Sequence, residues 1–468
     1  MKENPEGRRK GLRVRLDIPL SVLEIKNAVG YDVKSPGDAN VWITHVTTSS
    51  EEAFRGDLFV PLKGKLQNGE SYVAKAKKRG AVTISEIKGD ILCKSTGDAL
   101  LSIARYYKTK LPSLFSTVAI TGSVGKTTTK EFLYRILSTK FCVHKSQGNY
   151  NNDIGLPLSI LAAPRSTELL ILEMGMNHIG EIARLTECAS PDVAVITNIG
   201  TAHIGNLGSR EEIAKAKLEI KGGGAKLIVP YGESLLNSFS DVSFSSLDKR
   251  ADLFVTRKDA SVLVYKRGKR ILSAAFSPIG GQFTECLASA IAVATELNLS
   301  TSEIGAGISS IGSGDTRLKI TPLGDFSIIE DYYNASLESF IADFKLMNML
   351  GSTTKSSLIG TIMELGDLSK KIHYRLGREA AEHGLDKLYL IGEMSRFVKR
   401  GAVDYGFDEK SIFMASSNED AARIIAEKHL SGEMILFKAS RAIKLENCAD
   451  ILKAIYAGGN KERKESVQ

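Results

Sequence analysis

Apolar and polar positions change their spacing several times along the chain, and each change marks an expected helix or strand. Between Asp57 and Ile84 a short apolar run is followed by a glycine-bearing loop, a lysine-rich segment of helical spacing and a second apolar run. This order predicts a small α/β unit. A helical segment at 98–110 comes next, and Leu111-Pro112 ends it because the residue before a proline avoids the helical conformation. We therefore expect a domain boundary at 112/113.

From residue 116 to residue 230 strand-like runs alternate with helical patterns. Such alternation predicts a parallel sheet with helices on both faces. Ser209 and Glu212 have the spacing of a capping box, which would open the third helix. The expected strands are 116–120, 168–174, 192–199 and 226–230, and the expected helices are 130–139, 180–189 and 209–220.

A Gly/Ser-rich stretch at 308–317 predicts a second boundary at 313/314. A third alternating series follows and predicts a separate open, Rossmann-like α/β domain. Its expected strands are 326–331, 356–360, 385–392 and 433–439, and its expected helices are 339–350, 370–384, 419–430 and a last one to Tyr456. The predicted fold class is thus α/β with three domains, 1–112, 113–313 and 314–468.

The composition excludes few partners and locations for this protein. The formal charge of +8 could serve nucleic acid, a membrane surface or an anionic small substrate, and solubility is the simplest explanation. We expect no nucleic-acid partner. The five cysteines lack a C-x-x-C pair, which is typical of reduced thiols. Because no apolar run reaches about 18 residues and the start lacks the apolar core of a signal peptide, we expect a cytoplasmic protein without a membrane span.

The stretch 121–128, TGSVGKTT, follows a strand-like run and precedes a helix. In that context backbone N–H groups can surround phosphate, Lys126 can reach its outer oxygens and the Thr127 hydroxyl can ligate Mg²⁺. The usual pattern has a glycine where this chain has Ile120, so the loop is a tighter variant, and an accidental glycine turn is the alternative. The expected nucleotide-binding residues are Gly122, Ser123, Val124, Gly125, Lys126, Thr127 and Thr128.

Polar side chains also follow the next two expected strands. Glu173 ends the run 168–174, and His203 comes shortly after the run 192–199. Ligands of open α/β sheets bind at the carboxyl ends of the strands, so both side chains could lie beside the phosphate loop. Glu173 could hold Mg²⁺. The simpler alternatives are a solvated glutamate at a strand end and an ordinary loop histidine.

With these residues in place, the chain resembles the Mur ligases of peptidoglycan synthesis, most closely the branch that joins D-Ala-D-Ala to UDP-N-acetylmuramoyl-tripeptide. The resemblance covers nearly the whole chain. Its first motif would belong to a domain that binds the uridine nucleotide of the substrate. The matching segments are 56–64, 121–128, 148–161, 172–182, 197–209, 213–220, 328–340, 363–366 with a later His373, and KASR at 438–441.

The resemblance implies a role for each matching residue. Lys126 would contact the outer phosphates of ATP, Thr127 and Glu173 would hold one Mg²⁺, and His203 would hold a second. Lys217 occupies the position of a lysine that is carbamylated by CO₂ and then helps to bind metal. The catalytic set would be Lys126, Glu173, His203, Lys217 and Asp331; Arg317 and Asp331 would reach the nucleotide; and the substrates would meet Asn149, Asn151, Asn152, Asn334, Lys438, Ser440 and Arg441.

The implied reaction is amide formation through an acyl phosphate, with the tripeptide carboxylate and the dipeptide amine as reactants. The chain departs from the family pattern where a helix normally carries residues that seat the adenine, because Phe283, Thr284 and Leu287 stand there. Two alternatives follow: a nucleotide-binding relative that has lost catalysis and acts as a scaffold or regulator, or a sister ligase that adds a single amino acid. The sequence does not indicate an oligomeric state, and a monomer is the default.

Overall fold

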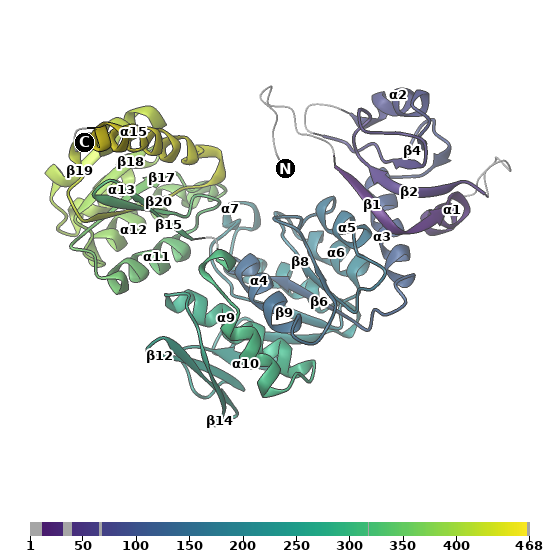
Figure 1. Cartoon of the computed structure of the whole chain (residues 1–468), viewed down its shortest axis with the longest axis horizontal. Coiled ribbons are helices and arrows are strands. Elements are labelled where there is room, and N and C mark those ends of the chain that lie inside the picture. Colours follow the sequence, from purple (N-terminus) through teal and green to yellow (C-terminus); the bar gives the residue numbers. More distant parts are fainter. Residues whose placement is uncertain (1–11, 31–39, 65–67, 317, 466–468) are drawn as a thin grey trace. The chain divides into compact units, whose positions relative to one another are not determined.

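The computed structural model describes residues 12–30, 40–64, 68–316 and 318–465. Its strands form three separate sheets of five, nine and six strands, with helices between them in sequence (Figure 1). The predicted α/β class is confirmed. The domain boundaries at 112/113 and 313/314 stay predictions, and Arg317 lies outside the described residues. No helix in the described ranges has the length and apolarity needed to cross a bilayer.

The N-terminal sheet has the strand order β1-β2-β3-β4-β5. β1 runs antiparallel to β2, and the following neighbours pair in parallel. The last helix of this part ends at Thr109, close to the predicted stop before Pro112. The elements are β1 (Arg13–Ser21), β2 (Trp42–Thr47), β3 (Asp57–Phe59), β4 (Val82–Ser85), β5 (Ile91–Leu92), α1 (Val22–Val29), α2 (Val73–Lys78) and α3 (Thr96–Thr109).

The central sheet has the order β14-β13-β12-β11-β10-β9-β6-β8-β7, and its strands from β10 to β7 are parallel. Every residue of β6 and β8 is buried, as expected of parallel strands covered on both faces. The strands are β6 (Ser116–Thr121), β7 (Val143–Lys145), β8 (Leu169–Glu173), β9 (Val193–Ile196), β10 (Lys226–Pro230) and β11 (Val242–Ser245). The helices are α4 (Lys126–Leu137), α5 (Gly155–Leu161), α6 (Glu181–Ala189), α7 (Ile204–Leu207), α8 (Arg210–Leu218), α9 (Gly281–Glu296) and α10 (Thr301–Ser309).

Three antiparallel strands that the sequence patterns did not predict extend this sheet: β12 (Leu253–Lys258), β13 (Ser261–Lys266) and β14 (Lys269–Ala275). α9 packs against β12, and α10 packs against β14. The turn between β13 and β14 has positive φ at Arg267 and Gly268, the conformation that a two-residue hairpin turn requires. Val255, Val262 and Val264 face the helices and are buried.

The C-terminal sheet has the order β15-β16-β20-β17-β18-β19, and β15 is its antiparallel edge strand. The carboxyl ends of β16, β17 and β20 lie side by side, which is where ligands bind in such sheets. Its elements are β15 (Lys319–Leu323), β16 (Phe326–Glu330), β17 (Thr354–Gly360), β18 (Lys387–Ile391), β19 (Ile412–Ala415), β20 (Glu433–Lys438), α11 (Leu337–Leu350), α12 (Ser369–Glu382), α13 (Ser395–Asp404), α14 (Asn418–Lys428) and α15 (Glu446–Glu465).

Candidate functional site

The predicted phosphate loop connects β6 to α4, with glycines at both of its ends. Gly122 has a φ of +149° and Gly125 a φ of +85°, which L side chains rarely adopt. A Cβ on Gly122 would lie 1.8 Å from the Thr197 hydroxyl oxygen, so the loop backbone lies directly against that residue. The Lys126 ammonium donates to the carbonyl oxygens of Gly122 and Ser123 at 2.6 and 3.3 Å. The loop therefore has the tight turn and the lysine that a phosphate site needs.

Asn198, which sequence reasoning did not single out, holds this loop in place. Its side-chain oxygen accepts from the backbone N–H groups of Ser123 and Val124 at 3.1 and 3.0 Å. Its amide nitrogen donates to the Val124 carbonyl at 3.0 Å, and the Thr197 hydroxyl donates to the same carbonyl at 2.6 Å. Because this amide can donate and accept at once, it holds both N–H groups and a carbonyl group of the loop backbone. The signal in the sequence was an asparagine two residues after a buried strand.

α9 supports the loop from another side and carries the residues that depart from the family pattern. The Cys286 thiol lies 3.8 Å from the Gly125 carbonyl oxygen, and Phe283 packs on Phe132 of α4 with ring centroids 6.5 Å apart. Thr284 and Leu287 are also buried. In this conformation the three departing side chains serve helix packing and are not available for contacts to a base.

Glu173 ends β8 and is 1 % exposed, so it is not the solvated glutamate of the simpler alternative. It is in register with Ile120 of β6, two residues before the phosphate loop begins. Asn151 donates to its carboxylate at 2.9 Å. Asn152 has a local role, because its side chain accepts from the N–H of Gly155, the first residue of α5, at 2.8 Å. The Asn149 side chain is exposed.

Lys217 lies near the end of α8 and is 2 % exposed. A solvated lysine on a charged helix, the simpler interpretation, is therefore wrong. Burial of an ammonium is costly, which makes a buried lysine a candidate for chemistry. The predicted cap of this helix is present, because Glu212 N–H donates to the Ser209 hydroxyl at 3.2 Å.

His203 directly precedes α7 and has a positive φ of 64°. Its Nδ1 lies 2.5 Å from a carboxylate oxygen of Glu364, which belongs to the MELG segment. In the ranges that the structure describes, no three His, Cys, Asp or Glu side chains converge as a metal cage would require. Mg²⁺ is usually held by one or two carboxylates with substrate phosphates and water, so the predicted ligands fit a site that the nucleotide completes. An imidazole suits such a hard cation least, which makes His203 the weakest of them.

Asp331 and Lys438 meet at the carboxyl ends of β16 and β20. Lys438 is 1 % exposed and makes ion pairs with Asp331 and with Asp343 of α11, the latter at 2.7 Å. Burial alone would lower the pKa of Lys438, but the two carboxylates outweigh it and raise that pKa to about 12. Burial, with the nearby charge of Asp331, raises the pKa of Asp343. The sequence did not indicate that Asp343 belongs to this cluster, since an aspartate inside a helix is usually an ordinary surface residue.

The other predicted residues of the C-terminal part have varied roles. The Ser440 hydroxyl accepts from the N–H of Met363 at 2.9 Å, and Arg441 pairs with Glu446 at 2.8 Å. The exposed Asn334 accepts from the N–H of Ala335. His373 is fully buried, and both of its ring nitrogens have partners. Its Nε2 accepts from the Ile362 N–H at 2.9 Å, and its Nδ1 lies 2.7 Å from the Ser369 carbonyl. Burial lowers the pKa of His373, which fits a neutral ring that anchors the MELG segment.

Comparisons with known proteins show similarity over nearly the whole chain. Residues 120–240 match the Mur ligase middle domain. A UDP-N-acetylmuramoyl-tripeptide–D-alanyl-D-alanine ligase of Bacillus subtilis is 34% identical over 447 residues, which span 92% of this chain and 97% of that ligase. A crystal structure of MurF from Acinetobacter baumannii covers 94% of this chain and 100% of its own, with a TM-score of 0.85 and 27% identity. MurF from Thermotoga maritima in complex with ADP covers 87% and 97%, with a TM-score of 0.77 and 29% identity.

Proposed function

Because this chain belongs to the Mur ligase family, we propose that it uses ATP to join D-Ala-D-Ala to UDP-N-acetylmuramoyl-tripeptide in the cytoplasm. The observation that carries this proposal is the similarity to the Bacillus subtilis ligase over almost the full length of both chains. The glycine turn, Lys126 and the clamp by Asn198 supply a phosphate site of the kind the reaction needs.

In the proposed reaction the terminal carboxylate of the tripeptide attacks the γ-phosphorus of ATP, which gives an acyl phosphate and ADP. The amine of D-Ala-D-Ala then attacks the acyl carbon and displaces phosphate. Lys126 would turn from its loop carbonyls toward the outer phosphates, where its charge offsets the negative charge of the transferred group. Asp331 and Arg317 would contact the nucleotide, and Asn334, Lys438, Ser440 and Arg441 would position the dipeptide.

Thr127, Glu173 and His203 would hold Mg²⁺, with Lys217 as a fourth ligand once carbamylated. The metal would supply charge neutralisation at the transferred phosphoryl group. Asn151 supports this role, because its bond to Glu173 fixes the orientation of the buried carboxylate. Removal of divalent cations with EDTA should stop turnover, and added Mg²⁺ should restore it.

The carbamate on Lys217 has its own test. Lys217→Ala should lower turnover strongly, and short-chain carboxylates supplied with CO₂ should restore part of it. Lys215→Ala is the matched control, because this lysine lies two residues away on the same helix with its side chain 69 % exposed. Wild-type turnover in the Lys217 variant, or an equal loss in the control, would contradict the assignment.

One observation favours the scaffold as a second candidate. Phe283, Thr284 and Leu287 are buried in helix packing, so the usual adenine contacts of the family are missing from this segment. A phosphate-release assay distinguishes the candidates. Release that depends on ATP, the UDP-tripeptide and D-Ala-D-Ala together supports the proposed ligase. Binding of ATP without release supports the scaffold, and release with a single amino acid in place of the dipeptide supports a sister ligase.

A further inference from the structure

Most of the net positive charge of the chain lies on a single segment. Residues 249–270 hold eight lysines and arginines against two aspartates, a net charge of +6, whereas the whole chain carries +8. This segment forms β12, β13 and their turns up to the start of β14. Charge that served solubility alone would be spread over the surface, so its concentration on one hairpin region points to a partner of opposite charge.

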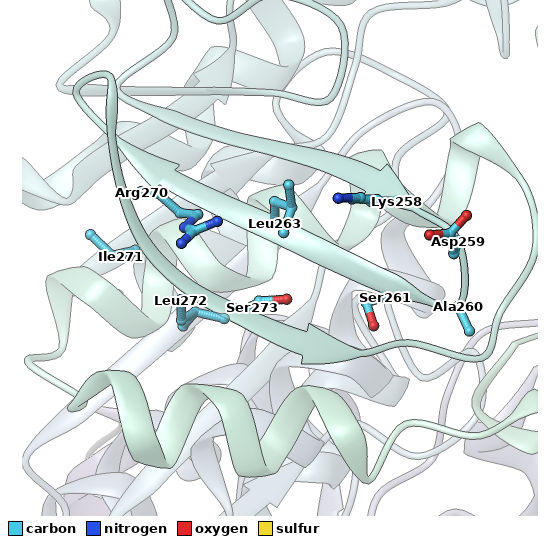
Figure 2. A pocket seen from close by; sticks show the side chains of 9 residues that line it. All are labelled: Lys258, Asp259, Ala260, Ser261, Leu263, Arg270, Ile271, Leu272 and Ser273. Carbon is cyan, nitrogen blue, oxygen red and sulfur yellow. The ribbon is translucent and has the colours of Figure 1, made fainter.

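One face of the strands in this segment is open. Strand alternation places Phe254, Leu263 and Tyr265 opposite the face that α9 and α10 cover, and all three are half-buried. A groove of about 690 Å³ runs along this face. Figure 2 shows the charged ends of Lys258 and Arg270 pointing toward Leu263 from opposite ends of the groove.

Six of the eight cations make no ion pair with any residue that the structure describes. Of these, Arg257 donates to the carbonyls of Phe276 and Pro278. Register pairs Lys266 with the buried Leu253 and Lys269 with Lys266, so both lie on the side of the sheet that the helices cover.

We call the remaining three the basic face: Lys258 and Arg270, which line the groove, and Lys249 in the loop before β12. Their neighbours differ, because Arg250 pairs with Asp248 and Arg267 lies 3.6 Å from Asp252. Since local carboxylates do not neutralise the basic face, its charge is available to an external anion.

An exposed leucine lies at one end of the basic face. Leu247 is 93 % exposed, in the loop before β12. The Arg267 N–H donates to the Asp252 carbonyl at 2.8 Å, and Leu253 is in register with Lys266, so this loop and the β13–β14 turn share one end of the sheet. A large apolar side chain beside lysines is the combination that binds at phospholipid interfaces.

We propose that the basic face and Leu247 dock this protein onto the surface of an anionic phospholipid bilayer. The cations lie at the head groups, and Leu247 enters the boundary with the acyl chains. Phe254 and Tyr265 pack on each other with ring centroids 5.8 Å apart, which adds an apolar centre to this face. This docking is independent of the proposed catalytic function.

The test is sedimentation of the full-length protein with vesicles. One set consists of phosphatidylcholine alone, and the other is an equal mixture of phosphatidylcholine and phosphatidylglycerol. We expect binding to the mixed vesicles alone, with release at high salt. The variant K249Q/K258Q/R270Q should bind about 100-fold more weakly, at about fivefold for each cation removed. Leu247→Ser should weaken binding about tenfold.

The control variant K88Q/K94Q/K345Q makes the same change in net charge at exposed lysines of other elements and should bind like the wild type. Absence of sedimentation with mixed vesicles, or an equal loss in the control, would overturn the proposal. So would binding to a single-stranded oligonucleotide that is tighter than binding to vesicles and is lost in the first triple variant. That result would assign the face to nucleic acid.

Discussion

Lys438→Met should destabilise the C-terminal part of the chain by about 3–5 kcal/mol, the usual cost of removing one partner from a buried ion pair. Methionine has a similar volume, so packing is largely preserved and the lost charge dominates. What is left is two carboxylates with no cation between them: Asp343, with 6 % of its side chain exposed, and Asp331, with 19 %. Their repulsion and the burial of Asp343 both disfavour the charged form.

The stability lost in Lys438→Met should depend on pH. Burial already raises the pKa of Asp343 in the folded protein, and loss of Lys438 raises it further. The folded variant then holds a proton that the unfolded chain releases, so its stability falls as the pH rises above the usual carboxyl range. The penalty should be largest at pH 8 and smaller at pH 5. Adding Asp343→Asn to the variant should recover part of the loss, because one of the two charges is then gone.

Hydrogen exchange of the peptides that cover β16, β20 and α11 is the suitable assay, since the single tryptophan, Trp42, lies in the N-terminal sheet. A loss of about 3–5 kcal/mol should speed exchange there by between about 100-fold and a few thousand-fold. If Lys438→Met exchanges like the wild type at pH 8, or if the loss does not depend on pH, then the cluster is not held together by charge and the reasoning is wrong.

Three further changes should be measurable. Gly122→Ala places a methyl group against Thr197 and should weaken ATP binding in calorimetry at least about tenfold, whereas Gly305→Ala, which meets open space in α10, should leave it unchanged. Asn198→Ala strands two loop N–H groups and should weaken ATP binding by about tenfold or more; an unchanged affinity would show that the loop does not need its clamp. Because burial lowers the pKa of His373, the unfolded chain takes up a proton more readily as the pH falls below about 6.5. Stability should therefore fall on acidification, and His373→Asn should flatten that slope in thermal melts; an unchanged slope would assign the effect to another group.

The parts of the fold that repeat a local pattern could be predicted from the sequence. Alternating apolar runs and helical segments indicated β6, β8, β9 and β10 of the central sheet, but not β7 or β11, and they indicated most strands of the C-terminal sheet. The antiparallel strands β12 to β14 were missed, although the turn at Arg267-Gly268 and the alternating valines on β12 and β13 carry a hairpin signal. Charged residues near the ends of these strands, such as Lys258 and Lys266, obscure the alternation there.

Some residues of the candidate site could likewise be predicted from the sequence, and others could not. Glycine spacing and a following lysine identified the phosphate loop, because that chemistry is local in sequence. Burial of Lys217 and the contact of Asp343 with Lys438 depend on residues that are distant in the chain, and no periodicity reveals them. The role of Asn198 lies between these cases, since its position after a strand was visible but its two loop partners were not.

The clamp on the phosphate loop also has a consequence for the thermodynamics of nucleotide binding. Hydrogen bonds from Asn198 and Thr197 hold the loop backbone, so its conformational entropy should be lost when the protein folds and not when ATP arrives. A preorganised loop of this kind should bind nucleotide with little structural adjustment and a modest entropic cost. Differences in affinity among loop variants should then appear mainly in how fast the nucleotide leaves.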